Sequence, residues 1–173
     1  PFVGQSISSF LTNPENKIIL SSGVYSMMSH VESPEAWIAN FTAAKIGDIN
    51  LGQGYNVKRY VDGLVNFRGT PNNATTTKAI TNGDNGWNFL SNPFTSSITA
   101  TSTANAYDNL LSTNTAQLDP SYTALYIWVE DPITNTNSYK AITQTGGDLN
   151  QHYIQVGQGY LVKSEVGGGN FKI

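Results

Sequence analysis

The sequence contains no cysteine. This absence excludes disulfide bonds, thiolate metal centres and cysteine nucleophiles. Charged residues are also scarce, at 12% of the chain, against about 25% in an average soluble domain. The formal net charge is -3, and no block of Lys or Arg supplies the basic field that a nucleic-acid backbone requires. We therefore expect no nucleic-acid partner.

Long apolar runs are absent as well. The longest aliphatic and aromatic run covers residues 124–129, far below the ~20 residues that a membrane helix needs, so we expect no membrane span. The chain begins at Pro1, with no initiator Met and no signal-like stretch, which is typical of a processed or excised polypeptide. Together with the abundance of Asn, Thr, Ser and Gly, this start predicts an extracellular or cell-surface location.

What the chain does contain is enough apolar and aromatic material, 39% and 11%, for a packed core. Short β-branched and aromatic runs alternate with clusters of Gly, Pro, Asn and Asp, the pattern of strands and tight turns. We predict an all-β fold, an antiparallel β-sandwich of the jelly-roll or immunoglobulin-like type. One turn is predicted within "DPITNTN", residues 131–137, and helical turns are predicted within residues 33–41 and 105–111.

A Gly-Gln-Gly-Tyr box occurs twice, at residues 52–55 and 157–160, and each box is followed by an apolar strand pattern. We interpret the boxes as equivalent joints between a turn and a strand in two homologous repeat units. The units are predicted at residues 12–69 and 70–173, with an insert near residues 95–121. The pattern at residues 25–29 has a counterpart at 87–91, and that at 36–38 has one at 124–128.

The strand pattern around Phe67 recurs at Phe171 and, more weakly, at Phe10, so the chain begins and ends at the same phase of its repeat. A unit of that kind leaves one sheet edge open and one strand loose, which favours head-to-tail strand addition between subunits. We predict that residues 1–11 form a donor strand. The expected assembly residues are Phe2, Val3, Ile7, Phe10 and Phe171.

Three stretches carry a resemblance to a known family: "GWNFLSNPFTSSI", "ALYIWVED" and "IQVGQGYLVK". Together with the preceding "VNFRGTPNNATTTKAITNGD", they resemble the β modules near the C-termini of large secreted and surface proteins of the Bacteroidetes, often just ahead of a type IX secretion sorting signal. The resemblance covers most of residues 64–163 and, through the repeat, 23–58. It implies a secreted bacterial β module and no single activity, because such modules accompany hydrolases, adhesins and fibrous proteins alike.

Aromatic side chains are the main candidates for ligand contact. A sugar ring stacks on an aromatic face through its C–H groups, while Asn and Gln amides bind its hydroxyls. We expect Trp87 to be a core residue of the repeat. The strand at residues 124–130 is bulky on both faces, so it is either buried on both sides or open to a partner. The predicted glycan or partner contacts are Trp37, Tyr122, Tyr126, Trp128 and Tyr139.

Other constellations are weaker. The boxes lack the Lys-Ser/Thr and helix of a phosphate-binding loop. The only histidines, His30 and His152, lie in opposite halves without metal-ligand spacing. Acidic turns at residues 82–85, 130–131 and 148–150 are interpreted as turns rather than calcium sites. We predict no cofactor and no metal. Asn40 and Asn73 begin N-x-Thr sequons and are formal glycosylation sites.

Two functions follow from these patterns. The first is a non-enzymatic extracellular structural or adhesive β module, a self-associating subunit of a bacterial surface fibre built by head-to-tail strand addition. The alternative is a carbohydrate-binding module from a secreted polysaccharide-degrading enzyme. A hydrolase is the least favoured, because Glu130 and Asp131 are adjacent on a strand and point to opposite faces, so they cannot flank one bond.

Overall fold

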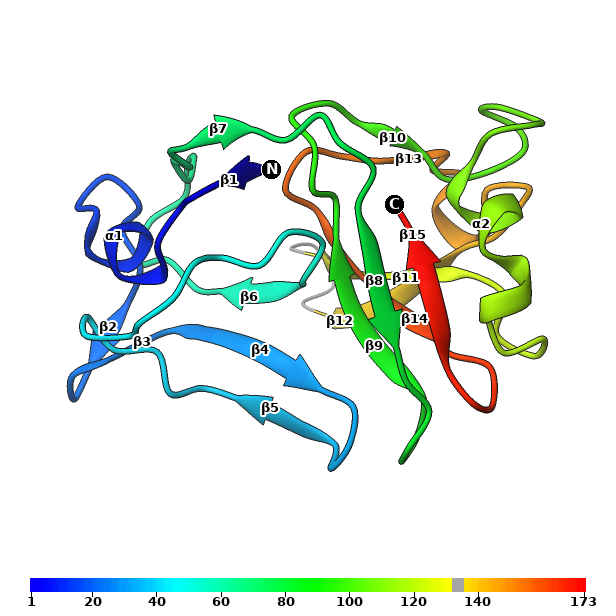
Figure 1. The fold of residues 1–173 in the computed structure, drawn as a ribbon. Coiled ribbons are helices and arrows are strands. Elements are labelled where there is room, and N and C mark those ends of the chain that lie inside the picture. The colour runs from blue at the N-terminus through cyan, green and yellow to red at the C-terminus, as the bar shows by residue number, and fades with distance from the viewer. Residues whose placement is uncertain (132–135) are drawn as a thin grey trace.

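The computed structural model describes residues 1–131 and 136–173, and the side chain of Asp131 lies outside the description. The predicted turn at 132–135 therefore also lies outside the described residues. The chain is mostly β, with several small antiparallel sheets (Figure 1). Its helices are α1 (Ile7–Thr12), α2 (Leu110–Thr113), η1 (Thr115–Gln117) and η2 (Gly147–Leu149). Its strands are β1 (Phe2–Val3), β2 (Leu20–Ser21), β3 (Val24–Tyr25), β4 (Met27–Val31), β5 (Ala36–Ile38), β6 (Tyr55–Val57), β7 (Thr70–Pro71), β8 (Thr77–Ile80), β9 (Trp87–Ser91), β10 (Ile98–Thr99), β11 (Leu125–Asp131), β12 (Thr136–Ile142), β13 (Tyr153–Ile154), β14 (Gly159–Lys163) and β15 (Gly169–Lys172).

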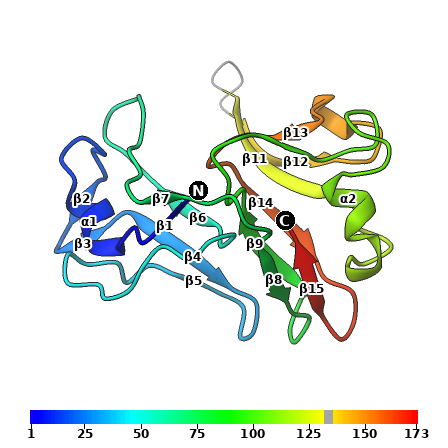
Figure 2. The same ribbon diagram turned by 45° about the horizontal axis from the view of Figure 1, so that its top comes forward.

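Two sheets dominate the described chain. The first half of the chain builds a three-stranded sheet in the order β5-β4-β6, and the second half builds a four-stranded sheet in the order β12-β11-β14-β9. Small two-stranded sheets pair β1 with β7, β2 with β3, β8 with β15, and β10 with β13. Figures 1 and 2 show the first half, in blue and cyan, beside the second half, in green to red.

Each half has its own hydrophobic core. The first core holds Ile7, Phe10, Leu11, Ile18, Met27 and Phe41. The second is larger and runs from Ile80 to Ile173, with the side chains of Tyr160, Val162 and Phe171 completely buried. The two clusters divide the chain between Phe67, which packs against the first, and Ile80, which begins the second.

The N-terminal segment differs from its prediction. Residues Ile7–Thr12 form helix α1, in which the Ser6 side chain accepts a hydrogen bond from the Ser9 N–H and caps the helix. Ile7, Phe10 and Leu11 follow the three-and-four spacing of a helix face and are buried in the first core. The predicted strand through Ile7 and Phe10 is therefore wrong, because the serine cap and this spacing favour a helix.

The remaining predicted assembly residues also pack within their own chain. Phe2 and Val3 form β1, which pairs with Pro71 and Thr70 of β7. Phe171 lies in β15, opposite Lys78 of β8. In this structure, residues 1–11 are thus part of the chain's own fold rather than a loose donor strand.

Several other elements can be compared with their predictions. Strand β9 has the predicted bounds, whereas residues 64–67 form no strand and the helical turn predicted within residues 33–41 is wrong, since β5 lies there. A helix does begin at the end of the predicted 105–111 segment, as α2. β5 lies beside β4, but β11 lies beside β14, so the two predicted counterparts occupy different places in their sheets.

The two Gly-Gln-Gly-Tyr boxes form the same local turn. Gly52 and Gly157 have φ angles of 72° and 71°. Each is the third residue of a four-residue turn, which is closed by a hydrogen bond from the Gln53 N–H to the Asn50 carbonyl in the first box and from the Gln158 N–H to the Gln155 carbonyl in the second. A positive φ at the third position is the requirement of a type II turn and explains the first glycine of each box.

Both boxes then meet the same strand. Leu90 of β9 pairs with Gln53 on one edge and with Tyr160 on the other. The second glycines, Gly54 and Gly159, lie against the ring of Phe89, where an added Cβ would approach ring atoms to 2.5 Å and 2.8 Å respectively. The second glycine of each box is therefore needed because the Phe89 ring occupies the space of a side chain.

A buried carboxylate links the halves. Glu32, directly after β4, is 5% exposed, and its oxygens accept hydrogen bonds from the N–H groups of Gly83, Asp84 and Gly86 and from the Thr81 hydroxyl. Burial raises the pKa of the Glu32 carboxyl, but these four hydrogen bonds outweigh burial and lower the pKa from 4.5 to about 2. The carboxylate is thus ionised at neutral pH and holds the 81–86 loop onto the first half.

Candidate binding groove

The strand pair β11–β12 places two exposed aromatic residues side by side. Trp128 is directly opposite Tyr139 in the antiparallel register, and their ring centroids are 5.0 Å apart with planes inclined by 67°. The two side chains are 49% and 40% exposed. Directly opposite residues project from the same face of a sheet, so this pair forms one aromatic surface.

The alternation along β11 explains why the strand looked bulky on both faces. Leu125 and Ile127 are buried in the second core, whereas Tyr126 and Trp128 project from the opposite face. One face of β11 is therefore buried in the core, and the other face carries the half-buried Tyr126 and the exposed Trp128. The predicted choice between a doubly buried strand and an open strand is resolved as a strand with one open face.

The third aromatic residue comes from the other half of the chain. Trp37 lies on β5 opposite His30 of β4, and its ring contacts Phe89 of β9 with centroids 5.5 Å apart. This contact brings the outer faces of the two main sheets together. Trp37 remains 38% exposed.

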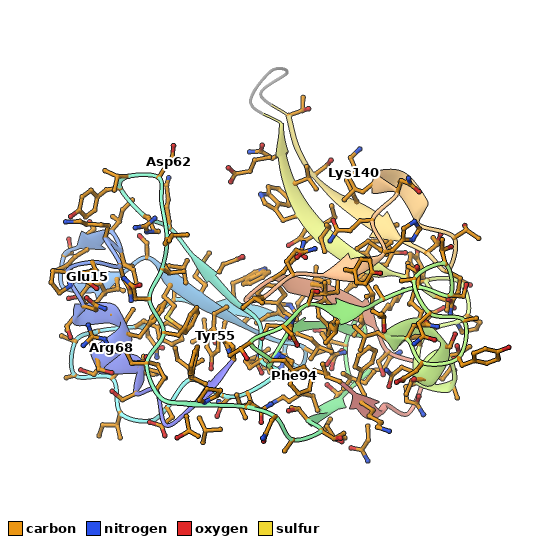
Figure 3. The ribbon with its side chains drawn as sticks, turned by 90° about the horizontal axis from the view of Figure 1, so that it is seen from above. Glu15, Tyr55, Asp62, Arg68, Phe94 and Lys140 are labelled. Atoms are coloured by element: carbon orange, nitrogen blue, oxygen red, sulfur yellow. The ribbon has the colours of Figure 1, made fainter. Side chains whose placement is uncertain are left out.

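Beside this contact the two faces enclose an open groove of about 950 Å³. Trp37, Trp128 and Tyr139 all line it, together with polar side chains from both halves. Figure 3 shows the β11–β12 hairpin, which carries the labelled Lys140, projecting on the same side of the molecule as the loop that carries Asp62. The groove is lined by Ser21, Val24, Tyr25, Ser26, Met27, Met28, Trp37, Ala39, Asn56, Val57, Lys58, Trp128, Glu130 and Tyr139.

The polar groups of the groove are varied in chemistry. Asn56 supplies an amide, Lys58 an ammonium group and Glu130 a carboxylate. A tyrosine hydroxyl is protonated at neutral pH and can donate a hydrogen bond, and burial raises the pKa of the Tyr139 hydroxyl further. The groove thus combines aromatic faces with hydrogen-bond donors and acceptors.

The other two predicted contact residues, Tyr122 and Tyr126, lie in a separate cluster. Both pack edge-on against Trp87, with ring centroids 5.7 Å and 5.0 Å away. The Lys163 ammonium sits 4.0 Å from the centre of the Tyr122 ring and forms an ion pair with Asp119. This cluster is filled by the chain's own cation, so its aromatic faces are less available to a ligand.

The predicted glycosylation residues are both exposed. Asn40 follows β5, and its side-chain oxygen accepts a hydrogen bond from the Lys45 ammonium. Asn73 lies between β7 and β8. The structure thus leaves both residues on the surface, where a sugar could be attached.

The histidines and the acidic turns have structural roles. His30 is buried against Trp37 with ring centroids 5.0 Å apart. Burial lowers the pKa of His30, and this effect outweighs the charges of Glu35 and Glu32, which raise it. His152 Nδ1 lies 2.9 Å from the Thr101 hydroxyl. Among the described residues, no group of three or more His, Cys, Asp or Glu side chains is placed to hold a metal ion.

The turn at residues 82–85 surrounds an anion rather than a cation. Its N–H groups point at the Glu32 carboxylate, and Asp84 accepts a hydrogen bond from the Glu35 N–H. Asp148 likewise accepts from the Ala141 N–H. Residues 82–85 lie in the loop between β8 and β9, as predicted, whereas residues 148–150 lie in and directly after η2. The turn predicted at residues 130–131 is wrong, because both residues belong to strand β11, and the Asp131 side chain lies outside the described residues.

Sequence reasoning missed two groups of residues. Glu32 gave no signal, because its partners are backbone N–H groups about fifty residues away along the chain. Asn56 and Lys58 were treated only as part of the strand after the first box. They line a groove because β6 is an outer strand of its sheet, with β4 as its one neighbour in that sheet. No local sequence pattern reveals this position.

No helix in the described part of the chain is long and apolar enough to cross a membrane. Comparison of the chain with protein-family models, curated proteins and solved structures found no match.

Proposed function

We propose that this chain is a non-enzymatic carbohydrate-binding module that works outside the cell. The observation that carries the proposal is the meeting of Trp37, Trp128 and Tyr139, from distant parts of the sequence, in one open groove. A pyranose ring has a C–H face that packs on an aromatic ring and hydroxyls that bind amides and charged groups. The groove offers both kinds of contact.

The same lining favours binding over catalysis. A glycoside hydrolase uses two carboxyl groups that flank the scissile bond. Among the described residues that line the groove, Glu130 supplies the one carboxylate. Binding needs no such pair, so the lining matches a binding module better than a hydrolase.

The test is a glycan array probed with the unmodified chain and with the double variant Trp128→Ala/Tyr139→Ala. We expect binding to at least one glycan class and its loss in the double variant. Tyr107→Ala is the matched control, because Tyr107 is 96% exposed and lies outside the groove lining. Absence of binding across the array, or equal binding by the double variant, contradicts the proposal.

The proposed location rests on the sequence. Low charge and a surface rich in hydroxyls and amides fit a secreted protein, and the resemblance to Bacteroidetes surface modules points the same way. Detection of the protein in the medium or on the surface of the source cells tests this part.

We also infer that the two halves are related β units that face each other in the manner of a sandwich. The matching turns of the two boxes and the contact of both boxes with Phe89 support this inference.

A second candidate function is self-association into a surface fibre. The observation that favours it is β12, the outermost strand of the four-stranded sheet, whose first four residues are exposed. An outer strand can accept a strand from a second copy. Electron microscopy of native material should then show filaments, whereas a concentrated sample that stays monomeric by light scattering contradicts this candidate.

A further inference from the structure

The groove does not end at its aromatic wall. A second hollow of about 610 Å³ shares Met27, Asn56 and Val57 with it. The second hollow continues along the turns of both boxes and under the segment that carries Leu64 and Val65. The two hollows therefore border the same strand, β6, and this shared lining points to one extended path around the strand.

The size of this path favours a chain over a small ligand. Pockets for compact molecules measure roughly 300–1,000 Å³ and enclose most of the ligand. The first hollow, at about 950 Å³, is at the upper end of this range, and the second, at about 610 Å³, extends the path beyond it. A ligand that used the whole path would be extended and would leave both of its ends outside.

The path carries few charged groups. Among the described side chains that line the two hollows, Lys58 and Glu130 are the ionised ones, with opposite signs. The other polar groups of the lining are neutral, for example the amides of Asn50 and Gln53. Pro1 also lines the second hollow, and burial lowers the pKa of its terminal amine. A chain with one carboxylate per sugar would therefore meet at most two amines, and burying its other charges without partners is costly.

The orientation of the rings argues against a flat target. The face of a polysaccharide crystal is planar, so it would stack on rings that lie in one plane. The Trp128 and Tyr139 planes are inclined by 67°, and Trp37 belongs to the other sheet. Rings set at an angle around a groove fit the sides of a single twisted chain.

We propose that the groove binds an internal stretch of a single, soluble, neutral polysaccharide chain. This inference rests on the proposed carbohydrate-binding function and narrows its ligand. Trp128 and Tyr139 stack on sugar faces in the first hollow, and the amides of the second hollow bind hydroxyls of neighbouring sugars.

The experiment is affinity electrophoresis of the full chain in gels that contain hydroxyethylcellulose, galactomannan, soluble β-1,3-glucan or polygalacturonate, with parallel sedimentation assays on microcrystalline cellulose and chitin. We expect retardation by at least one neutral soluble polysaccharide, with retardation by polygalacturonate and sedimentation with the insoluble polymers at least tenfold weaker. Trp128→Ala should weaken the interaction at least tenfold, and Tyr107→Ala should leave it unchanged.

Chain length provides a second readout. A hexasaccharide of the bound polymer should bind at least tenfold more tightly than its disaccharide, and Gln53→Ala should reduce this ratio, because Gln53 lines the second hollow. Equal affinity for the two lengths overturns the extended path. Preferential binding to polygalacturonate, cellulose or chitin overturns the neutral soluble chain and leaves the carbohydrate-binding function standing, whereas no binding to any of these polymers overturns both.

Discussion

Strands β6 and β14 follow the same box and the same turn, yet they end in different surroundings. In β14, which lies between β11 and β9, Tyr160 and Val162 are completely buried. In β6, which has only β4 beside it in its sheet, Tyr55 is half-buried and Val57 is 37% exposed. A shared motif therefore sets the local turn and strand, while the neighbours in the sheet decide whether the strand becomes core or groove.

The largest expected effect on stability comes from replacing each box tyrosine by alanine in separate variants. Tyr160→Ala should lower the free energy of unfolding by about 3–5 kcal/mol, the usual cost of removing a buried aromatic ring. Tyr55→Ala should cost less than half as much, because its ring is partly exposed. Urea unfolding of both variants measures the difference, and equal losses would show that β6 is as central to its core as β14.

The next effect tests the link between the halves. Glu32→Ala leaves buried N–H groups of the 81–86 loop without their acceptor, at about 1–3 kcal/mol for each unsatisfied group. We expect a loss of about 3 kcal/mol or more in urea unfolding. Glu32→Gln, which keeps one acceptor oxygen, should lose less, and two variants that both match the unmodified chain contradict the role of the link.

The same carboxylate predicts a pH dependence. The pKa of Glu32 is about 2 in the folded chain against 4.5 for the free group, so its stabilisation is complete above pH 4.5 and is lost as the pH falls through about 2. Glu32→Gln should remove this part of the acid-induced loss. The measurement is the free energy of unfolding of the unmodified chain and of Glu32→Gln between pH 4.5 and about 2. The same dependence on pH in both proteins would contradict the hydrogen bonds assigned to Glu32.

The glycines beside Phe89 give a smaller effect. Gly54→Ala and Gly159→Ala each place a methyl group against the buried ring, and such overpacking costs about 1–3 kcal/mol. Gly54→Ala should be the worse of the two, because its Cβ would approach several ring atoms of Phe89 below 3.0 Å, the nearest at 2.5 Å. Thermal unfolding ranks the variants, and a stable Gly54→Ala protein would remove the packing reason for the box.

The smallest effect has the opposite sign. The Tyr160 hydroxyl is buried and has no hydrogen-bond partner among the described residues. Tyr160→Phe removes a polar group that pays for desolvation without compensation, so it should raise the stability by about 1 kcal/mol. A loss of stability in the same unfolding assay would reveal a partner for this hydroxyl.

Local chemistry made part of the fold predictable. Clusters of Gly, Asn and Pro marked the turns, and alternating aromatic residues marked β9, β11 and β14. The boxes were correctly interpreted as joints between a turn and a strand, because their glycines have a backbone requirement that sequence alone can express. Helix α1 was missed because the prediction took Phe10 as a counterpart of the strand pattern around Phe67 and gave no weight to the serine cap.

The sequence predicted some of the aromatic residues of the candidate site but not that they meet in one groove. Trp37, Trp128 and Tyr139 were selected as exposed aromatic residues, but their meeting depends on the contact between Trp37 and Phe89 across two sheets. Tyr122 and Tyr126 were selected by the same rule and lie instead in a cluster with Trp87 and Lys163. Long-range packing separates these two outcomes, and no pattern within either strand encodes it.

The most direct test of the groove is the affinity of Trp128→Ala for the glycan that the unmodified chain binds, measured by isothermal titration calorimetry. We predict a loss of at least tenfold in affinity, with a change in unfolding free energy below about 1 kcal/mol because Trp128 is half exposed. Unchanged affinity in a folded variant would contradict the assignment of this groove as the carbohydrate site.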